Sequence, residues 1–303
     1  MENKYVIEGK NIRKTYGKFT LDMPEVKIPK GFATALIGEN GAGKTTLLNI
    51  LAGIVLDYVG NLTFFDRYND ADREKNPEVK ERIGYTGTTG YYLPQWTLNQ
   101  IRRIQSALFE NFDTDRYDAL CDDMALDTKG FKNGNKKVST LSDGSRTKLM
   151  LAGVFARQTD LLLLDEPASP LDPLMREKLC MMIREYLNEN EGEKSVVFST
   201  HNISDMENVT DYAVIVEHGQ IVEQGFVEDL KEKYIAVSGE LSAKEVAEKV
   251  LYSMESSSMG FEGIVLAEHI DALAGLDVAL QTPTLSQIVV AVMKNHSRMK
   301  REA

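Results

Sequence analysis

The stretch GFATALIGENGAGKTTLLNILAGI, residues 31–54, decides the fold of this 303-residue chain. It opens with a short apolar run, passes through a glycine-rich turn and continues with apolar residues at helical spacing. Residues 38–46 match G-x-x-x-x-G-K-[ST], a pattern that is meaningful only between a strand and a helix. Both neighbours are present, so the segment predicts a strand, a phosphate-binding loop and a helix.

The residue types in this loop are those that phosphate binding requires. Glycines allow backbone N–H groups to turn inward toward phosphate oxygens, and the following helix N-terminus adds a partial positive charge. Lys44 is expected to reach the β- and γ-phosphates, and the Thr45 hydroxyl to ligate Mg²⁺. The predicted nucleotide-binding residues of the loop are Gly38, Glu39, Asn40, Gly41, Ala42, Gly43, Lys44, Thr45 and Thr46.

The segments around the loop predict an α/β fold. LLLL at 161–164 and SVVFSTH at 195–201 are apolar runs of the kind found in parallel strands buried on both faces. Helical patterns alternate with these runs, as in a parallel sheet. By contrast, 5–17 and 19–29 alternate apolar and polar residues, which favours antiparallel strands with one solvated face. His218-Gly219 reads as the turn of a hairpin.

Two further regions interrupt or follow this core. The stretch between Gly90 and Ser139 is mostly helical in pattern and predicts an inserted helical subdomain, at about 90–150. After about residue 235 the pattern changes again. We expect an ATPase-type domain at 1–235 and a small α+β extension at 236–303. Its segments 242–254, 261–270 and 283–295 predict helix, strand and helix, and Thr284 with Gln287 forms a capping box.

Asp165 and Glu166 end the apolar run LLLL. An acid at this place can hold Mg²⁺ through water, and a second acid beside it can orient or deprotonate an attacking water. The same pair, placed before Pro167, is also typical of a helix start, where acids are favoured. The phosphate loop upstream in the same sheet favours the catalytic interpretation.

Composition excludes several classes of function. The formal charge of −11 argues against a nucleic-acid-binding surface, which needs clustered Lys and Arg. Cys121 and Cys180 lack metal or redox spacing and are expected to be buried thiols. We find neither a signal-peptide pattern at the start nor a window of about 18 apolar residues, so we expect a protein on the cytoplasmic side.

Six motifs in sequence order then resemble the nucleotide-binding subunits of ABC transporters, over roughly residues 4–235. LSDGS at 141–145 stands where their LSGGQ signature stands, about twenty residues before the acidic strand. The resemblance implies an ABC-type P-loop NTPase that binds ATP and Mg²⁺. The other motifs are KTYG with Tyr16, the Walker A loop at 38–46, LLLLDEP, ASPLD with Asp172, and STH with His201.

The resemblance also implies a role for each residue. Tyr16 stacks on adenine, Glu166 is the catalytic glutamate, and His201 contacts the γ-phosphate. Ser142 and Gly144 contact the γ-phosphate bound to a second copy. Each residue has an ordinary alternative when taken alone: Tyr16 as a strand aromatic, His201 as a hydrogen-bonded strand end, and Asp172 as a helix cap.

Two departures from the family pattern matter. Asp143 replaces a glycine of the signature, and a carboxylate about 6 Å from a phosphate charge costs on the order of 3 kcal/mol at a dielectric near 20. We therefore expect Asp143 to point away from the nucleotide. The family's glutamine after a strand like RIGY is also missing. Thr88 takes its place in the alignment and is our predicted third Mg²⁺ contact beside Thr45 and Asp165, with Gln95 as the alternative.

The function that the resemblance implies is ATP hydrolysis by a head-to-tail pair of ATPase subunits, identical or different, that power a separate membrane permease. The short extension resembles exporter-type subunits for peptides, lipids or antimicrobial compounds, and is expected to stabilise the dimer or regulate it. The alternative is a non-transport ABC protein. Action on DNA is disfavoured because only 98 positions separate Lys44 from Ser142, without a long insertion. A sensor or regulatory ATPase stays open.

Overall fold

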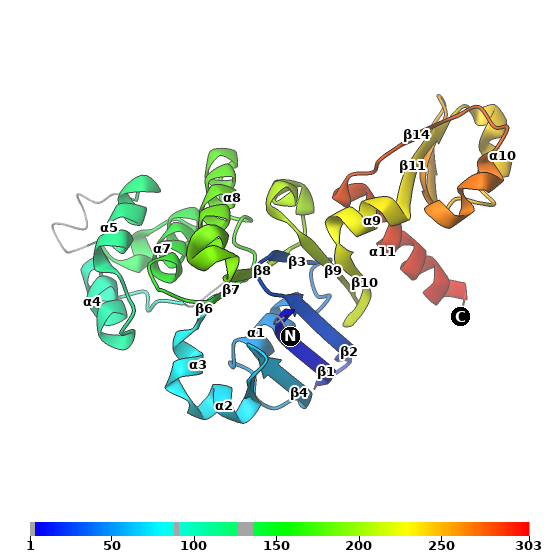
Figure 1. Cartoon of the computed structure of the whole chain (residues 1–303). Coiled ribbons are helices and arrows are strands. Elements are labelled where there is room, and N and C mark those ends of the chain that lie inside the picture. The colour runs from blue at the N-terminus through cyan, green and yellow to red at the C-terminus, as the bar shows by residue number, and fades with distance from the viewer. Residues whose placement is uncertain (1–3, 88–90, 127–135, 303) are drawn as a thin grey trace.

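The computed structural model describes residues 4–87, 91–126 and 136–302, with side chains described as far as Ser297. The centre of the molecule is a six-stranded sheet of order β10-β9-β3-β8-β7-β6 (Figure 1). Its five strands from β9 to β6 run parallel, and β10 pairs antiparallel with β9. The strands are β3 (Ala33–Ile37), β6 (Ile83–Thr86), β7 (Leu161–Leu164), β8 (Ser195–Thr200), β9 (Tyr212–Glu217) and β10 (Gln220–Phe226).

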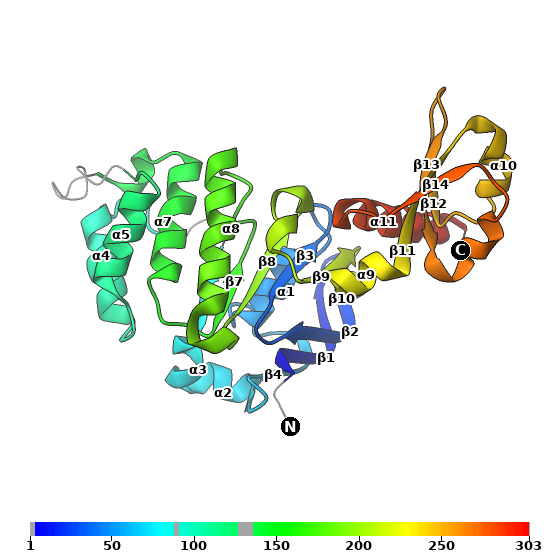
Figure 2. The same cartoon turned by 45° about the horizontal axis from the view of Figure 1, so that its top comes forward.

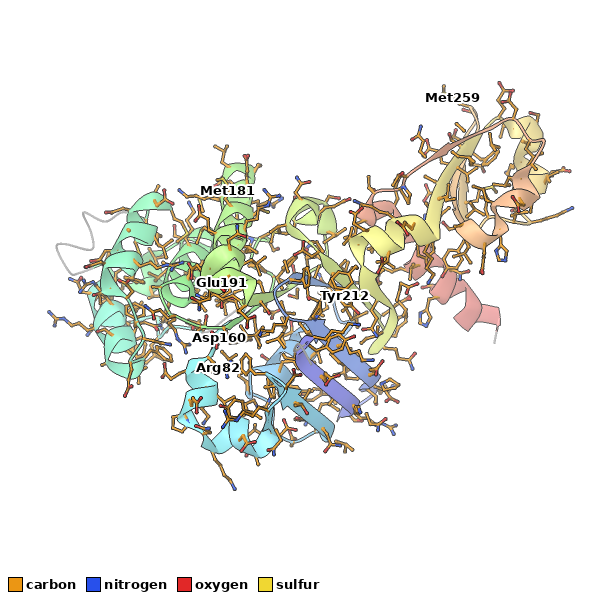
Figure 3. All side chains as sticks on the ribbon, viewed as in Figure 1. Arg82, Asp160, Met181, Glu191, Tyr212 and Met259 are labelled. Carbon is orange, nitrogen blue, oxygen red and sulfur yellow. The ribbon has the colours of Figure 1, made fainter. Side chains whose placement is uncertain are left out.

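Every residue of β3, β7 and β8 is buried, as the continuous apolar runs predict for strands covered on both faces. At the amino ends of the parallel strands, Arg82 and Asp160 form an ion pair between the starts of β6 and β7 (Figure 3). The hairpin predicted around His218-Gly219 is formed by β9 and β10.

A second, antiparallel sheet of order β2-β1-β4-β5 covers one face of the central sheet, with α1 between them. Buried side chains of α1 and of both sheets form one continuous core cluster. The prediction of antiparallel strands at the N-terminus is confirmed. The elements of this layer are β1 (Tyr5–Tyr16), β2 (Phe19–Pro29), α1 (Lys44–Leu51), β4 (Val59–Phe64) and β5 (Tyr68–Asn69).

Helices cover the other face. The apolar sides of α7, α8 and α11 share one core cluster with Ala35, Val196 and Ile215 of the central sheet. α4, α5 and α7 gather at one end of the molecule (Figures 1 and 2). Besides α1, the α-helices that the described residues form before the extension are α2 (Asp70–Lys75), α3 (Pro77–Glu81), α4 (Leu98–Leu108), α5 (Thr114–Asp123), α7 (Asp143–Phe155), α8 (Pro173–Asn188) and α9 (Val227–Lys233).

The C-terminal segment differs in detail from the expected helix, strand and helix. It forms a four-stranded antiparallel sheet of order β12-β13-β11-β14, followed by a long helix. The helix expected at 242–254 shrinks to a single turn because Tyr252 N–H bonds to the Ile264 carbonyl and starts a new strand. The elements are β11 (Tyr234–Gly239), α10 (Lys244–Ala247), β12 (Ser253–Ser256), β13 (Phe261–Leu266), β14 (Val278–Gln281) and α11 (Leu285–Glu302).

This sheet stands away from the central one, with Met259 at its far tip (Figure 3), while α11 returns to the core. The predicted capping box opens that helix: Gln287 N–H donates to Thr284 Oγ1, and Thr284 N–H to Gln287 Oε1. Cys121 and Cys180 are both buried free thiols, as expected. Across the described ranges, every helix falls short of the length or apolarity that crossing a bilayer requires.

Candidate active site

The glycine-rich loop lies between the end of β3 and the start of α1, and its shape depends on glycine. A side chain at Gly38 would place a Cβ 2.3 Å from the Val216 carbonyl oxygen. Gly41 and Gly43 have φ values of 86° and 109°, which other residues rarely adopt. A Cβ at Gly43 would also lie 2.8 Å from Leu21 of β2. The loop is therefore held against both sheets, with its N–H groups at the start of a helix.

Lys44 is almost completely buried at the first position of α1, with 5% of its surface exposed. Its ammonium donates to the carbonyl oxygens of Gly38 at 2.7 Å and Glu39 at 3.1 Å. It also lies 3.4 Å from Glu166 Oε1. A buried cation inside a concave loop is an anchor for an anionic ligand, because a phosphate offers it stronger acceptors than carbonyl groups do.

Asp165 and Thr45 lie next to each other at the end of β7 and the start of α1. The Thr45 hydroxyl donates to both carboxylate oxygens, at 2.9 and 3.1 Å, and Ser199 Oγ donates to Oδ1 at 2.6 Å. Burial raises the pKa of Asp165, and the hydrogen bonds from Ser199 and Thr45 partly oppose that rise. Ser199 belongs to the site but was missed by sequence reasoning; its place in STH at the end of the neighbouring strand was the available signal.

These oxygen atoms fit Mg²⁺. A hydroxyl and a carboxylate are hard donors, and Mg²⁺ in phosphate sites is typically held by one or two protein groups together with substrate oxygens. Within the described ranges, no group of three or more His, Cys, Asp or Glu is arranged to hold a metal by itself. Thr45 and Asp165 would hold the ion, which would supply charge neutralisation at the phosphates.

Glu166 is held in an unusual conformation, with φ at +48°. Its backbone N–H donates to Ser199 Oγ at 2.8 Å, and its Oε2 lies 2.8 Å from His201 Nδ1. Its Oε1 is buried and makes no hydrogen bond to the described protein atoms. A strained backbone of this kind is characteristic of functional sites. The carboxylate is thus oriented by His201 through one oxygen, while its other oxygen lies 3.4 Å from the Lys44 ammonium.

A pocket of about 240 Å³ collects these groups from loops that are far apart in the sequence. Asn40 comes from the phosphate loop, and Thr86 and Gly87 follow β6. The pocket lies at the carboxyl ends of parallel strands, where open α/β sheets bind their ligands. Its lining is formed by Asn40, Thr86, Gly87, Thr147, Met150, Leu151, Asp165, Glu166, Pro167, Ser169, Pro170 and His201.

Ser142 and Gly144 are not part of this pocket; they begin α7. Ser142 is the N-cap residue, and its Oγ accepts from the Ser145 N–H at 3.2 Å. A Cβ at Gly144 would lie 2.9 Å from the carbonyl oxygen of Pro170, so the start of α7 packs closely on that segment. Asp143 is exposed and pairs with Arg146 on its own helix at 3.1 Å.

Asp172 and Tyr16 lie at the edges of the site. Asp172 caps α8 by accepting from the Met175 N–H at 3.1 Å, which is the ordinary role considered above. Tyr16 ends β1 opposite Phe19, has 47% of its surface exposed and lies under the Lys14 ammonium at 4.9 Å. Phe19 in turn lies against Gly43 of the phosphate loop. An exposed ring near that loop is suited to stacking on a base.

The predicted contact of Thr88 lies outside the described residues. The described residues just before it, Thr86 and Gly87, do line the pocket. Gln95 lies in a turn, with its side chain exposed, and is not among the residues that line the pocket. The alternative in which Gln95 serves the nucleotide therefore receives no support from this arrangement.

Fold and site together define a P-loop nucleoside triphosphatase. The family model described as "ABC transporter" matches residues 21–169. The thiamine import ATP-binding protein ThiQ of Jannaschia sp. (strain CCS1) is 30% identical over 198 residues, which cover 65% of this chain and 82% of that protein. The chain belongs to the family of ABC transporter ATP-binding subunits. It is an ATP-binding and ATP-hydrolysing subunit.

Two further matches are an export ATP-binding protein and a solved structure. The Nod factor export ATP-binding protein I of Cupriavidus pinatubonensis (strain JMP 134 / LMG 1197) is 26% identical over 238 residues, covering 76% of this chain and 69% of that protein. The solved dimer of the ATP-binding cassette MJ0796 in a post-hydrolysis state, bound to ADP and Pi, superposes with a TM-score of 0.60 at 21% identity. That match covers 73% of this chain and 98% of the other. It shows the fold.

Proposed function

We propose that the subunit works as a head-to-tail dimer in which residues 38–46 of one copy and Ser142 and Gly144 of the other enclose one ATP. This proposal rests on one observation: within one chain, the signature serine lies apart from the other predicted nucleotide-site residues. The phosphate loop, Asp165, Glu166 and His201 converge, whereas the signature serine caps α7 and does not line the pocket. The dimeric arrangement of the cassette MJ0796 supports it.

Within that dimer the residues have distinct tasks. Lys44 and the loop N–H groups bind and orient the phosphates. The Glu166 carboxylate accepts a proton from, or orients, the attacking water, and His201 holds the glutamate and steadies the γ-phosphate. Asp172 is proposed to contribute from the dimer interface, and Tyr16 to stack on adenine. Hydrolysis removes the bridging phosphate contacts and opens the pair.

We further propose that opening drives a separate membrane permease at the cytoplasmic face, and that the assembly is an exporter of peptide, lipid or antimicrobial-type substrates. Support for export comes from the 238-residue match to a Nod factor export protein. The thiamine import protein, 30% identical over 198 residues, supports the coarser role of a transport ATPase. Purification of the chain with its membrane partner, followed by an uptake assay in inverted vesicles, tests this step. ATPase stimulation without substrate movement would favour the sensor or regulatory alternative.

The ATPase mechanism is tested by Glu166→Gln. We expect this variant to bind ATP and elute as a stable dimer in size-exclusion chromatography, with turnover lowered at least about 100-fold because the water loses its oriented base. Glu185→Gln, at an exposed glutamate of α8, is the matched control and should retain wild-type turnover. Near-normal turnover of Glu166→Gln would contradict the assignment.

A further inference from the structure

The last helix of the chain lies across the ATPase core. Leu285, Ile288 and Val292 of α11 are buried in the same cluster as the central sheet. At its start, Leu285 N–H donates to Glu207 Oε1 at 2.8 Å, just beyond the segment that carries His201. Figures 1 and 2 show α11 running between the C-terminal sheet and β9–β10. The extension is therefore in direct contact with the catalytic domain.

The other end of the described part of α11 meets a buried carboxylate. Glu217, the last residue of β9, has 6% of its surface exposed. Its Oε2 bonds to His296 Nδ1 at 2.5 Å, and its Oε1 accepts from Ser297 Oγ at 2.5 Å. A third group, His218 of the hairpin turn, lies 3.6 Å away and is mostly exposed. Both oxygens thus receive their close hydrogen bonds from α11, some 80 positions along the chain.

The turn next to Glu217 supports the phosphate loop. Gly219 N–H donates to the Ala42 carbonyl at 2.9 Å, and its own carbonyl accepts from Asp22 N–H at 2.8 Å. A Cβ at Gly219 would lie only 2.1 Å from the Thr20 carbonyl oxygen, so this turn is tightly enclosed. On the other side of Glu217, the Val216 carbonyl lies against Gly38. Glu217 therefore lies between two residues that contact the loop.

We propose that His296, together with Ser297, is a positioning residue for the phosphate loop and sets ATP affinity through Glu217 and the hairpin turn. A buried carboxylate that loses its donors must find water or other partners. We expect Glu217 to shift toward such partners, and His218 and Gly219, which follow it in the hairpin turn, to move with it. The Gly219–Ala42 hydrogen bond and the packing at Gly38 then loosen, and the loop presents a less ordered cradle to phosphate. The C-terminal extension is thus coupled to nucleotide binding.

The test is a set of variants at His296 compared by ATP binding and turnover. For His296→Ala we expect the Kd for ATP and the KM to rise about fivefold while kcat stays within about twofold, in the range of coupling through packed elements. His296→Asn should recover most of the affinity, because its amide nitrogen can take the place of Nδ1. The matched control is His269→Ala, since His269 is exposed in the same extension and lies 3.9 Å from the Glu268 carboxylate, its neighbour in the chain.

Hydrogen exchange supplies a readout that does not depend on turnover. In His296→Ala the amide of Gly219 and those of residues 38–44 should exchange faster than in the wild type, while β7 amides are unchanged. If His296→Ala does not fold, Ser297→Ala and Glu217→Gln, which keep the packing, replace it. Unchanged Kd and exchange in the folded variants, or equal losses in His269→Ala, would overturn the proposal.

The inference rests on the proposed role of residues 38–46 as the nucleotide loop. The variant Lys44→Ala distinguishes a failure of this loop assignment from a failure of the proposed coupling through α11. If Lys44→Ala binds ATP as tightly as the wild type, the loop assignment itself is wrong. If Lys44→Ala loses binding but His296→Ala does not change it, only the coupling through α11 fails.

Discussion

At the scale of single residues, two adjacent side chains at the start of α7 have different roles. The Ser142 hydroxyl caps the helix, whereas the Asp143 carboxylate pairs with Arg146 and is largely exposed. That Asp143 points away from the nucleotide bound to a second copy stays a prediction. In the proposed dimer, a carboxylate paired with Arg146 on its own helix would bring little unfavourable charge to the phosphate of the other copy.

We therefore expect Asp143→Gly to change ATPase activity by less than about threefold, because an exposed i,i+3 ion pair contributes little. Ser142→Arg should abolish activity, because a long side chain at the proposed trans contact blocks closure of the dimer. Steady-state ATPase assays on both variants, with circular dichroism to verify folding, measure the difference. The hypothesis would be wrong if both variants lost activity equally.

A second prediction at this scale concerns the missing glutamine. Gln95 is exposed in a turn, so Gln95→Ala should leave turnover within about twofold of wild type, as for most surface substitutions. Thr88→Gln should alter turnover, because Thr88 is our proposed positional equivalent of the family glutamine. Separate measurements of kcat at saturating Mg-ATP for the two variants decide whether Thr88 or Gln95 takes the place of the family glutamine. A loss confined to Gln95→Ala would reverse the assignment.

At the scale of elements, short-range hydrogen bonds fix where helices begin. Thr284 and Gln287 form the reciprocal pair that opens α11, and the Asp172 carboxylate caps α8 by accepting from the Met175 N–H. Such caps could be predicted from spacing alone because both partners lie within one turn. The length of α10 could not be predicted, because its helical pattern competes with strand pairing between β12 and β13.

Thr284→Ala should lower the free energy of unfolding by about 1 kcal/mol, the usual value of a lost N-cap. Thr284→Ser keeps the hydroxyl and should retain most of that stability. Urea unfolding followed by circular dichroism compares the two. Equal stability of Thr284→Ala and wild type would mean that α11 does not need its cap, despite the observed bonds.

At the scale of the whole molecule, one charged cluster joins the helical end to the core. Glu189, after α8, is 2.7 Å from Arg116 of α5 and also pairs with Lys194, which precedes β8. Burial opposes ionisation of Glu189, yet the hydrogen bonds from Arg116 and Lys194 hold its pKa below the usual 4.5. A lowered carboxyl pKa stabilises the folded state above the unfolded value, and that contribution disappears as pH falls through the folded value.

Stability should therefore fall as pH drops below 4.5, and part of this loss should be absent in Glu189→Gln. The variant should be less stable than wild type at pH 7 and approach it at acidic pH. Thermal melts from pH 7 to about pH 3 measure the two curves. Parallel curves would show that the cluster is not responsible; Glu185→Gln provides the control.

The sequence by itself determined the strand–loop–helix at the phosphate site, the buried parallel strands, the hairpin turn and the helix caps. These features depend on residues close together in the chain, so composition and spacing specify them. The order of six motifs, from Tyr16 through the phosphate loop, LSDGS, the acidic strand and ASPLD to His201, also predicted the family.

Only the tertiary structure decided which distant groups meet. Ser199 joins Asp165 and Glu166 because β7 and β8 are neighbours in the sheet. Glu217 meets His296 because α11 returns to the core after a separate sheet has formed. The four-stranded sheet itself arises from pairing between segments whose local patterns were ambiguous. In each case the stabilising contact joins residues far apart in sequence. The local pattern of apolar and polar residues therefore cannot predict it.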